Sequence, residues 1–425
     1  MKTDALSIFQ AGVKAADPYL AVRQHLTLNS QAKIHLVAFG KAACAMSRAA
    51  LELIPFEQLA GQGIVVTNYE NVSPVPYCDV IGAGHPLPNA DGFFAAQKIA
   101  ETVKHATADE LVLVLISGGG SALLPYPVAN VSLDDKITTT QLLLHSGVTI
   151  NQINGVRKHL SQLKGGALTR LAHPAKVYTL VLSDVLGDDL SAIASGPTVA
   201  DNTTYQDAIQ VLEPIWSLVP ESVQWHLLAG EQGLIAETPK ANDSIFKDSF
   251  VQVCASNAVS LHAMQQQAEQ LGYQTQIYSE QLCGIAKEEA ENLCKHHFNR
   301  TAPIAILAGG ETTVNVTGNG KGGRNQEFAL AFALAAEKVG LKNWTLLSGG
   351  TDGIDGVTDA AGGLVNEHTL QRIREHGLDP QALLNNNDAY TALNAANDLL
   401  ITGATGTNVA DLQILLLHPL GDADV

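Results

Sequence analysis

Glycine-rich turns follow three apolar runs of the sequence, and each turn could bind an anion. The runs LVLVLI, PIAILA and WTLLS each end in paired or tripled glycines, at 118–120, 309–310 and 349–350. Glycine permits positive φ and removes side-chain bulk, so successive N–H groups can point at one oxyanion. A single glycine pair more often makes only a tight turn. Three such transitions favour an anion-binding function.

The first of these turns, SGGGS, also offers side-chain donors. The hydroxyls of Ser117 and Ser121 flank Gly118, Gly119 and Gly120, so backbone and side-chain donors suited to phosphate lie together. Ser121 is also a conceivable nucleophile. However, the sequence holds no GxSxG motif and no identifiable histidine or aspartate partner for it. We therefore favour anion binding for this loop.

Two cations stand where a strand or a loop leads into a helix. Lys41 lies in GKAA after the apolar run IHLVAF, and Arg324 follows Gly322 and Gly323 just before a periodic helical stretch. The N-terminus of a helix disfavours a cation unless an anion compensates its charge. An ordinary solvated loop explains the neighbouring Lys321 well but explains Arg324 less well. Lys41 and Arg324 are therefore our candidate ligands for an anionic substrate.

Carboxylates also end or follow buried strands. Asp184 ends the run KVYTLVLS, where it could bind a metal or act as a base for a hydroxyl. For Asp188 we favour a helix N-cap. Asp352 could supply an oxygen ligand to Mg²⁺, and a surface Asx turn explains it equally well. His85 and His159 lack metal-ligand spacing, so we favour structural roles for both.

The elements that would position these residues alternate between strands and helices, which predicts an α/β fold. Continuous apolar strands indicate a sheet that is covered on both faces. The segment 197–249 is rich in proline and polar residues, as is typical of a peripheral excursion. The pattern restarts beyond it, so we place a domain boundary near residue 245 and predict domains at 1–245 and 246–425. Strands are expected at 34–39, 63–67, 78–84, 111–116, 176–183, 250–256, 273–279, 303–310 and 344–350, and helices at 91–106, 134–147, 150–166 and 325–340.

Composition narrows the class of function. The chain has 425 residues, of which 46% are hydrophobic, and a formal net charge of −17. So acidic a protein is not expected to bind nucleic acid or a membrane surface. Five cysteines without a CxxC pair and an N-terminus without a signal-type apolar run favour a cytoplasmic protein with reduced thiols. Neither a P-loop nor a Rossmann dinucleotide fingerprint is present.

The motifs taken together resemble the glycerate 2-kinases of the MOFRL type. They follow that family's order from about residue 35 to residue 412. One departure is Ala404 in TGATGTN, where the family pattern leads us to expect proline. The matching segments are VAFGKAA (37–43), GHPLPNADG (84–92), LISGGGSALL (115–124), INGVRKHLSQLKGG (153–166), LSDVLGDDLSAIASGPT (182–198), GGETTVNVTGNGKGGRNQEFAL (309–330), LSGGTDGIDGVTDAAGG (347–363) and TGATGTNVADL (402–412).

This resemblance implies an ATP- and Mg²⁺-dependent kinase that phosphorylates the 2-hydroxyl of D-glycerate. It implies a Rossmann-like N-terminal domain and a C-terminal MOFRL domain, with the active site in the cleft between them. Lys41 and Arg324 match the family's GKA and GGRNQE motifs. We also expect Glu311 and Asn408 to bind substrate or ATP. Asp184, at the end of a buried strand, is expected to bind Mg²⁺ or to orient the substrate hydroxyl, with Asp352 as the weaker metal ligand.

Two other functions compete with this one. A hydroxypyruvate reductase would need a nicotinamide site, for which the sequence shows no fingerprint. A non-enzymatic protein that binds phosphorylated metabolites would use the same glycine loops but would leave the aspartates unexplained. A kinase would use the glycine loops, the two cations and the aspartates, because phosphoryl transfer depends on positioning and on charge neutralisation.

Overall fold

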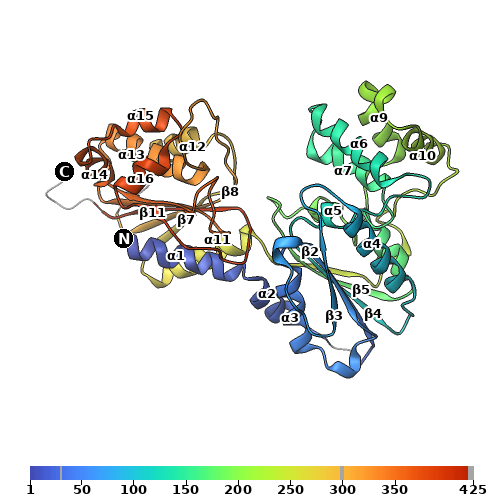
Figure 1. The fold of residues 1–425 in the computed structure, drawn as a ribbon. Helices are drawn as coiled ribbons and strands as arrows, with labels where there is room; N and C mark the ends of the chain where they lie inside the picture. The colour runs from blue at the N-terminus through green and yellow to red at the C-terminus, as the bar shows by residue number, and fades with distance from the viewer. Residues whose placement is uncertain (29–30, 297–300, 420–425) are drawn as a thin grey trace. The chain divides into compact units, whose positions relative to one another are not determined.

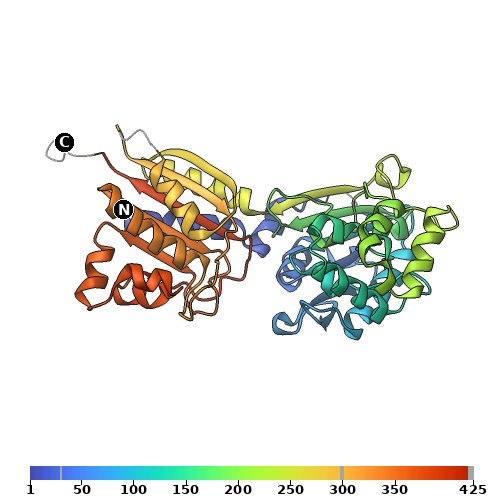
Figure 2. The same cartoon turned by 90° about the horizontal axis from the view of Figure 1, so that it is seen from above.

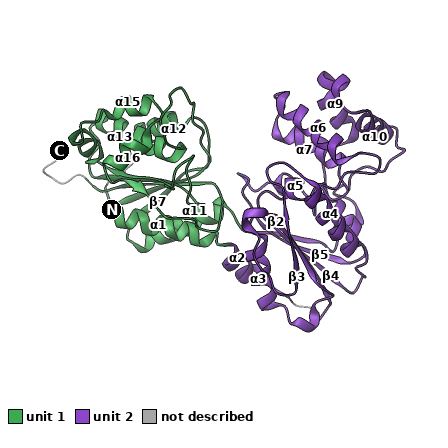
Figure 3. Cartoon of the chain, viewed as in Figure 1, with its two compact units in different colours: residues 1–17, 255–425 green, residues 18–254 purple. Residues whose placement is uncertain are grey.

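The chain folds into two compact units, each with its own sheet. A computed structural model describes residues 1–28, 31–296 and 301–419. One unit comprises residues 18–254, and the other comprises residues 1–17 together with 255–425 (Figure 3). The expected boundary near residue 245 takes no account of the N-terminal helix, which belongs with the C-terminal half of the chain.

The sheet of unit 18–254 has the strand order β3-β2-β1-β4-β5-β6. Its strands β1 to β5 pair in parallel. This is the order of a doubly wound Rossmann-type sheet, whose topological switch point lies between β1 and β4. The strands are β1 (Ile34–Phe39), β2 (Gly63–Asn68), β3 (Cys78–Ala83), β4 (Leu111–Ile116), β5 (Lys176–Leu182) and β6 (Phe250–Ala255).

Helices cover this sheet because its strands are apolar on both faces. The burial of β1 and β4 is almost complete, and their side chains join those of α4 and α8 in one core. The short helix α5 begins inside the SGGGS turn, at Gly120, with Gly119 as its N-cap. The helices next to the sheet are α2 (Pro18–His25), α3 (Ala43–Leu53), α4 (Ala90–Lys104), α5 (Gly120–Leu123) and α8 (Ala167–Ala172).

A group of helices with a separate apolar core extends this unit (Figure 1). It contains α6 (Leu133–His145), α7 (Ile150–His159), α9 (Tyr205–Leu212) and α10 (Glu221–Glu231). Ser132 caps α6 by accepting a hydrogen bond from the amide of Asp135, as the sequence predicts. The segment 197–249 is therefore an excursion that folds back onto the two preceding helices.

The second sheet has the order β11-β10-β9-β12-β8-β7. Only β7 and β8 pair in parallel, whereas β12 is antiparallel to both of its neighbours, β8 and β9. The last strand of the chain thus lies near the middle of the sheet, and the sequence analysis did not predict it. The strands are β7 (Gln274–Leu282), β8 (Ile304–Gly310), β9 (Trp344–Gly350), β10 (Gly362–Asn366), β11 (Leu399–Leu400) and β12 (Asp411–Leu417).

Both faces of this second sheet are covered (Figures 1 and 2). The N-terminal helix α1 (Lys2–Ala15) and α11 (Asn257–Gln270) share an apolar core with one face. The long helix α13 (Arg324–Val339) packs on the other face together with α12 (Ala286–Lys295), α14 (Thr369–Glu375), α15 (Pro380–Asn385) and α16 (Ala389–Ala395). None of the helices in the described ranges is long and apolar enough to cross a membrane.

Removal of the side chain of Phe9 should destabilise the unit that contains α1. Phe9 is 1% exposed and belongs to the core formed with α11 and the sheet. We expect Phe9→Ala to lower the free energy of unfolding by about 3–5 kcal/mol because it leaves a cavity. Urea denaturation measures this loss, and Phe94→Ala, which truncates a side chain that is 53% exposed, is the control. Equal stability of the two variants would contradict the assigned role of α1.

Candidate active site

The loops that follow β1 and β4 meet at the switch point of unit 18–254. The amide of Lys41 donates a 2.9 Å hydrogen bond to the carbonyl of Gly118. Gly40 has φ +122°, and a Cβ there would lie 2.2 Å from the Ser117 hydroxyl. That hydroxyl is buried and accepts a 3.0 Å hydrogen bond from the amide of Ala42. Ser117 therefore joins the two loops instead of pointing at a ligand.

The glycines of the second loop bring together three chemically active side chains. A Cβ on Gly118 would lie 2.1 Å from a carboxylate oxygen of Asp184. Gly119 has the left-handed φ of +84°, and a Cβ on it would lie 3.0 Å from the ring of His85 and 3.5 Å from Cε of Lys41. Glycine is required here because the three side chains occupy the space next to the backbone. The structure thus places Lys41 and Asp184, two predicted site residues, beside one loop.

The charges of this site are open to a ligand. Lys41 is exposed, and its ammonium has no carboxylate within 4.0 Å in the described part of the chain. Asp184 retains an exposed face, yet the surrounding protein raises the pKa of its carboxyl, an effect that Lys41 partly offsets. Burial and the charge of Lys41 lower the pKa of His85. A cation, a neutral imidazole and a carboxylate with raised basicity therefore surround the glycine loop.

Ser121 is part of a hydrogen-bonded support for this loop. Its hydroxyl lies 2.9 Å from that of Ser195, which in turn donates to the Asn154 carbonyl at 3.2 Å. The ammonium of Lys164 donates to the backbone carbonyl of Ser121 at 2.9 Å. Ser195 has φ +61°, a strained value for a residue with a side chain. None of these contacts supplies the base that a nucleophilic serine needs.

In the second unit, Arg324 is bound by two carboxylates. Its Nε and Nη2 donate to Asp411 at 2.5 and 3.0 Å, and its Nη1 lies 3.0 Å from Glu311. Burial lowers the pKa of the Arg324 guanidinium, but Asp411 and Glu311 together hold it above its ordinary value. The sequence analysis correctly required a partner for this cation but missed Asp411, which opens β12 between Gly310 and Gly350.

The N-terminus of α13 is capped from a distance by Asp355. This buried carboxylate accepts hydrogen bonds from the amides of Asn325 at 3.1 Å and Gln326 at 2.9 Å. Burial raises the pKa of Asp355 to about 6, while those two amides oppose the shift. A Cβ on Gly323 would lie 2.3 Å from the Asp355 carboxylate carbon. Glycine at position 323 therefore lets the Asp355 carboxylate come close enough to cap the helix.

The glycine loop that precedes Arg324 is already in contact with other parts of the protein, which bind its backbone amides and cover its glycines. The amides of Thr317 and Gly318 donate to the side chain of Asn387, each at 2.8 Å. Gly322 lies against the backbone of the same segment, with Ala389 N 3.4 Å from the place of a Cβ. The ammonium of Lys321 lies 3.8 Å from the ring centroid of Tyr390. This loop thus differs from the open SGGGS loop.

Asp352 and Asn408 lie together on the same side of this unit. The Asn408 side-chain amide donates to Asp352 at 3.4 Å, and Asp352 also accepts the amide of Ile354 at 3.0 Å in an Asx turn. Residues 1–28, 31–296 and 301–419 contain no group of three His, Cys, Asp or Glu side chains that could hold a metal ion. The expected cap at Asp188 is wrong, because Asp189 accepts the local amide, that of Ser191, at 2.8 Å.

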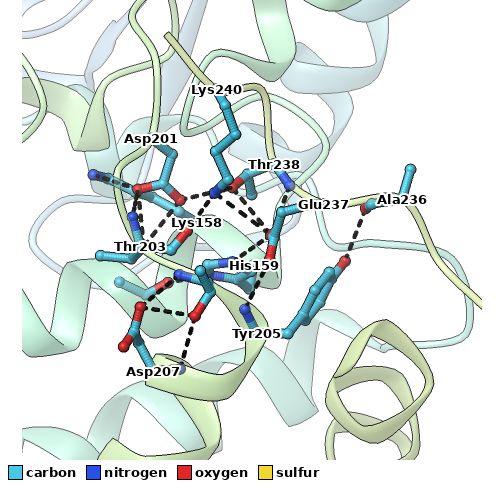
Figure 4. A network of polar contacts seen from close by, with 12 residues as sticks. Lys158, His159, Asp201, Thr203, Tyr205, Asp207, Ala236, Glu237, Thr238 and Lys240 are labelled. Carbon is cyan, nitrogen blue, oxygen red and sulfur yellow. Dashed lines mark hydrogen bonds and ion pairs between the residues drawn. The ribbon is translucent and has the colours of Figure 1, made fainter. Parts of the chain in front are cut away.

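The contacts of His159 agree with the structural role predicted for it (Figure 4). Its Nε2 lies 2.9 Å from the Glu237 carboxylate and its Nδ1 lies 2.8 Å from the Gly155 carbonyl. The adjacent Lys158 pairs with the fully buried Asp201 at 3.3 Å. Both residues therefore tie the end of α7 to the excursion.

The fold and these contacts define a class of protein. A Rossmann-type sheet with an exposed lysine, a carboxylate of raised pKa and a glycine loop at its switch point defines an α/β protein, and ligands of such sheets bind at this edge. The other unit adds Arg324, which pairs with Asp411 and Glu311 at the start of α13.

Comparison with known proteins gives the family. Residues 4–228 match the domain of unknown function DUF4147, and residues 304–411 match the MOFRL family. The glycerate 2-kinase of Pyrococcus horikoshii is 38% identical, over 97% of this chain and 96% of that protein. A protein of Agrobacterium vitis with a hydroxypyruvate reductase name is 41% identical, over 96% of this chain and 93% of its own length.

The fold agrees with this assignment. The crystal structure of a glycerate kinase from Thermotoga maritima matches with a TM-score of 0.90 and 39% identity, covering 98% of this chain and 99% of that one. The chain belongs to the glycerate kinase family that combines the DUF4147 and MOFRL regions.

Loss of Arg324 should destabilise the unit through Asp411. Asp411 is fully buried, so Arg324→Ala leaves an uncompensated carboxylate and should lower the free energy of unfolding by about 3–5 kcal/mol. Adding Asp411→Asn to this variant should restore part of the loss, which urea denaturation measures. Arg374→Ala is the control, because it breaks only an exposed pair with Glu337. A double variant that is no more stable than Arg324→Ala would show that Asp411 is not the cause.

Proposed function

We propose that this protein transfers the γ-phosphoryl group of ATP to the 2-hydroxyl of D-glycerate, giving 2-phospho-D-glycerate and ADP. Family membership supports the kinase activity, since relatives named glycerate 2-kinase cover almost the whole chain. The single structural observation that carries the proposal is the placement of Lys41 and Asp184 beside the same glycine loop, Asp184 next to Gly118 and Lys41 next to Gly119. A cation and a base beside one oxyanion-binding loop are the parts that phosphoryl transfer needs.

Each residue of this loop has a distinct role in the proposed reaction. The ammonium of Lys41 and the N–H groups of Gly118, Gly119 and Gly120 neutralise charge on the transferred phosphoryl group. Asp184 orients the substrate hydroxyl and accepts its proton as the hydroxyl oxygen forms the new bond to phosphorus and ADP leaves. The raised pKa of the Asp184 carboxyl suits a group that must accept a proton.

The carboxylates also fit the magnesium ion that accompanies ATP. Mg²⁺ bound to phosphates keeps several waters and needs only one or two protein carboxylates. Asp184 has a free, partly exposed carboxylate, whereas Asp352 already accepts hydrogen bonds from Ile354 and Asn408. As the alternative to its role as base, Asp184 would be the principal ligand, with Asp352 as the weaker one. The ion would supply additional neutralisation of phosphate charge.

The second unit would contribute a preset cation. Asp411 fixes one edge of the Arg324 guanidinium, and the Nη1 group points to the exposed Glu311. We propose that Arg324 binds a phosphate with its remaining donors and that Glu311 and Asn408 line the same part of the site. Because Lys41 and Arg324 belong to different units, both units are needed for turnover.

One pair of assays tests the proposed activity. The pure protein is incubated with D-glycerate, ATP and Mg²⁺, and separately with hydroxypyruvate and NADH, because one relative has a reductase name. We expect ADP in the first reaction and no loss of NADH in the second. Phosphorus NMR should identify 2-phosphoglycerate as the first product. Initial formation of 3-phosphoglycerate, or NADH loss without ADP, would reject the proposal.

Removal of either cation should slow the reaction. We expect Lys41→Ala and Arg324→Ala each to lower kcat/KM by roughly 10²-fold or more, on the scale of one lost transition-state charge contact. Lys41→Ala should leave stability unchanged because Lys41 is exposed and has no described ion-pair partner. Lys104→Ala, which removes another exposed lysine of the same unit, is the control. Near wild-type turnover in folded Lys41→Ala would exclude that residue from the site.

The carboxylate of Asp184 should be essential. Asp184→Asn cannot accept the proton and binds Mg²⁺ weakly, so we expect it to abolish most turnover with the fold intact, as judged by circular dichroism and steady-state kinetics. Asp188→Asn is the matched control. Asp188 has φ +53°, which asparagine tolerates, so this change should be mild. An active Asp184→Asn would remove Asp184 from the mechanism.

A further inference from the structure

Three cations gather near the end of α7 in unit 18–254. They are Lys136, Arg157 and Lys164, and the charge of Arg157 acts on both lysines. Lys158, which follows Arg157 in the sequence, has the buried carboxylate of Asp201 as its partner. No such carboxylate pairs with the three gathered cations within 4.0 Å among the described residues. No described carboxylate therefore neutralises these three side chains.

The two lysines of this cluster have structural partners. The ammonium of Lys136 donates to the carbonyl of Leu160 at 2.5 Å, and that of Lys164 donates to the carbonyl of Ser121 at 2.9 Å. These lysines are 5% and 2% exposed, and burial followed by the charge of Arg157 lowers the pKa of both. Lys136 thus supports the C-terminus of α7, and Lys164 supports the loop that carries Ser121.

Arg157 differs from both lysines. Its guanidinium has no hydrogen bond or ion pair with any described residue, although the protein around it lowers its pKa. Arg157 is partly exposed, so its guanidinium has lost part of its hydration without gaining a protein partner, and the neighbouring lysines add to the cost. A ligand anion would relieve it. Two N–H groups of a planar guanidinium can donate in parallel to the two oxygens of a carboxylate.

A small cavity lies at Arg157. It has a volume of about 120 Å³, and most of its lining is apolar, from α6, α7, the segment 86–88 and residue 125. Its polar lining residues are Arg157, Lys136, Ser121, Thr140 and Gln141. Pockets for drug-sized ligands are typically about 300–1,000 Å³, so this one suits a small anion and not a nucleotide. Ser121 ends the glycine loop, in which Gly118 lies next to Asp184 and Gly119 next to Lys41. Pro86 follows His85, which also lies next to Gly119. The cavity therefore adjoins the candidate active site.

We propose that Arg157 binds the carboxylate of the hydroxy-acid substrate in this cavity, with Lys136 and Lys164 adding to the positive potential. The inference rests on the proposed function, because it assigns one group of that substrate. Arg324, which the proposed function assigns to a phosphate, has Asp411 and Glu311 as protein partners, whereas Arg157 has no described partner. With the carboxylate at Ser121, the adjacent hydroxyl would lie toward the Asp184 end of the same short loop.

Binding measured without turnover tests this role. Isothermal titration calorimetry is performed with D-glycerate alone and with Mg·ATP alone on the wild type, Arg157→Gln, Arg157→Lys and the surface control Arg23→Gln. We expect Arg157→Gln to weaken D-glycerate binding about 10- to 100-fold, the scale of one lost hydrogen-bonded charge pair. Arg157→Lys should bind with intermediate affinity, because it keeps the charge but loses the planar fork. Binding of Mg·ATP should be unchanged in all variants.

Melting temperatures give a second readout. Without ligand, Arg157→Gln should melt at or above the wild-type temperature because it relieves repulsion with Lys136 and Lys164. D-Glycerate should raise the melting temperature of the wild type but not that of Arg157→Gln. If the glutamine variant fails to fold, Arg157→Lys replaces it in both measurements.

The outcomes separate this inference from the proposed function. Undiminished D-glycerate binding by folded Arg157→Gln would overturn the inference, as would loss of Mg·ATP binding with D-glycerate binding retained. Failure of the wild type to make ADP from D-glycerate and ATP would instead overturn the proposed function. Because the titrations contain no complete substrate pair, they report on Arg157 whatever the assay of transfer shows.

Discussion

A charged side chain taken out of water must have a partner, and the two units of this protein meet that requirement differently. In the unit that contains residues 255–425, Asp411 pairs with Arg324 and Asp355 accepts two backbone amides. In unit 18–254, the described contacts leave Lys41 and Arg157 without such partners. Compensation inside the protein stabilises the fold, whereas charge left open provides for a ligand. Within unit 18–254, Lys158 is compensated by Asp201, whereas the exposed Lys41 and the partly exposed Arg157 keep donors that a ligand could use.

The glycines that end the three apolar runs of the sequence have two different structural roles. In the SGGGS loop, Gly119 adopts a left-handed φ and the loop remains free to meet a ligand. Gly309 and Gly349 lie instead inside buried strands, where a Cβ on the first would approach Asn257 to 1.8 Å and one on the second would approach Phe9 to 3.0 Å. Repeated strand-to-glycine transitions therefore indicated close packing as well as anion binding, and only the structure separates the two.

Local patterns were sufficient for most of the fold. The expected strands at 34–39 and 111–116 coincide with β1 and β4, and the helix at 325–340 matches α13 to within one residue. The family resemblance was confirmed by the comparisons. The sequence analysis missed β12, although the apolar run DLQILLL is typical of a buried strand. It also missed the place of α1, because packing between Phe9 and residues beyond 255 leaves no local signal.

Long-range pairs account for what was missed in the site. Arg324 and Asp411 are 87 positions apart, and no spacing rule connects them. Their pairing has a mechanistic consequence: a guanidinium held on one edge by a buried carboxylate has lost its rotational freedom during folding and need not lose it again on binding. Lys41, exposed and unpaired, must be ordered by the ligand itself. In the proposed reaction, Arg324 would therefore be a preset cation that fixes geometry, and Lys41 an adaptable one that follows the charge as it moves.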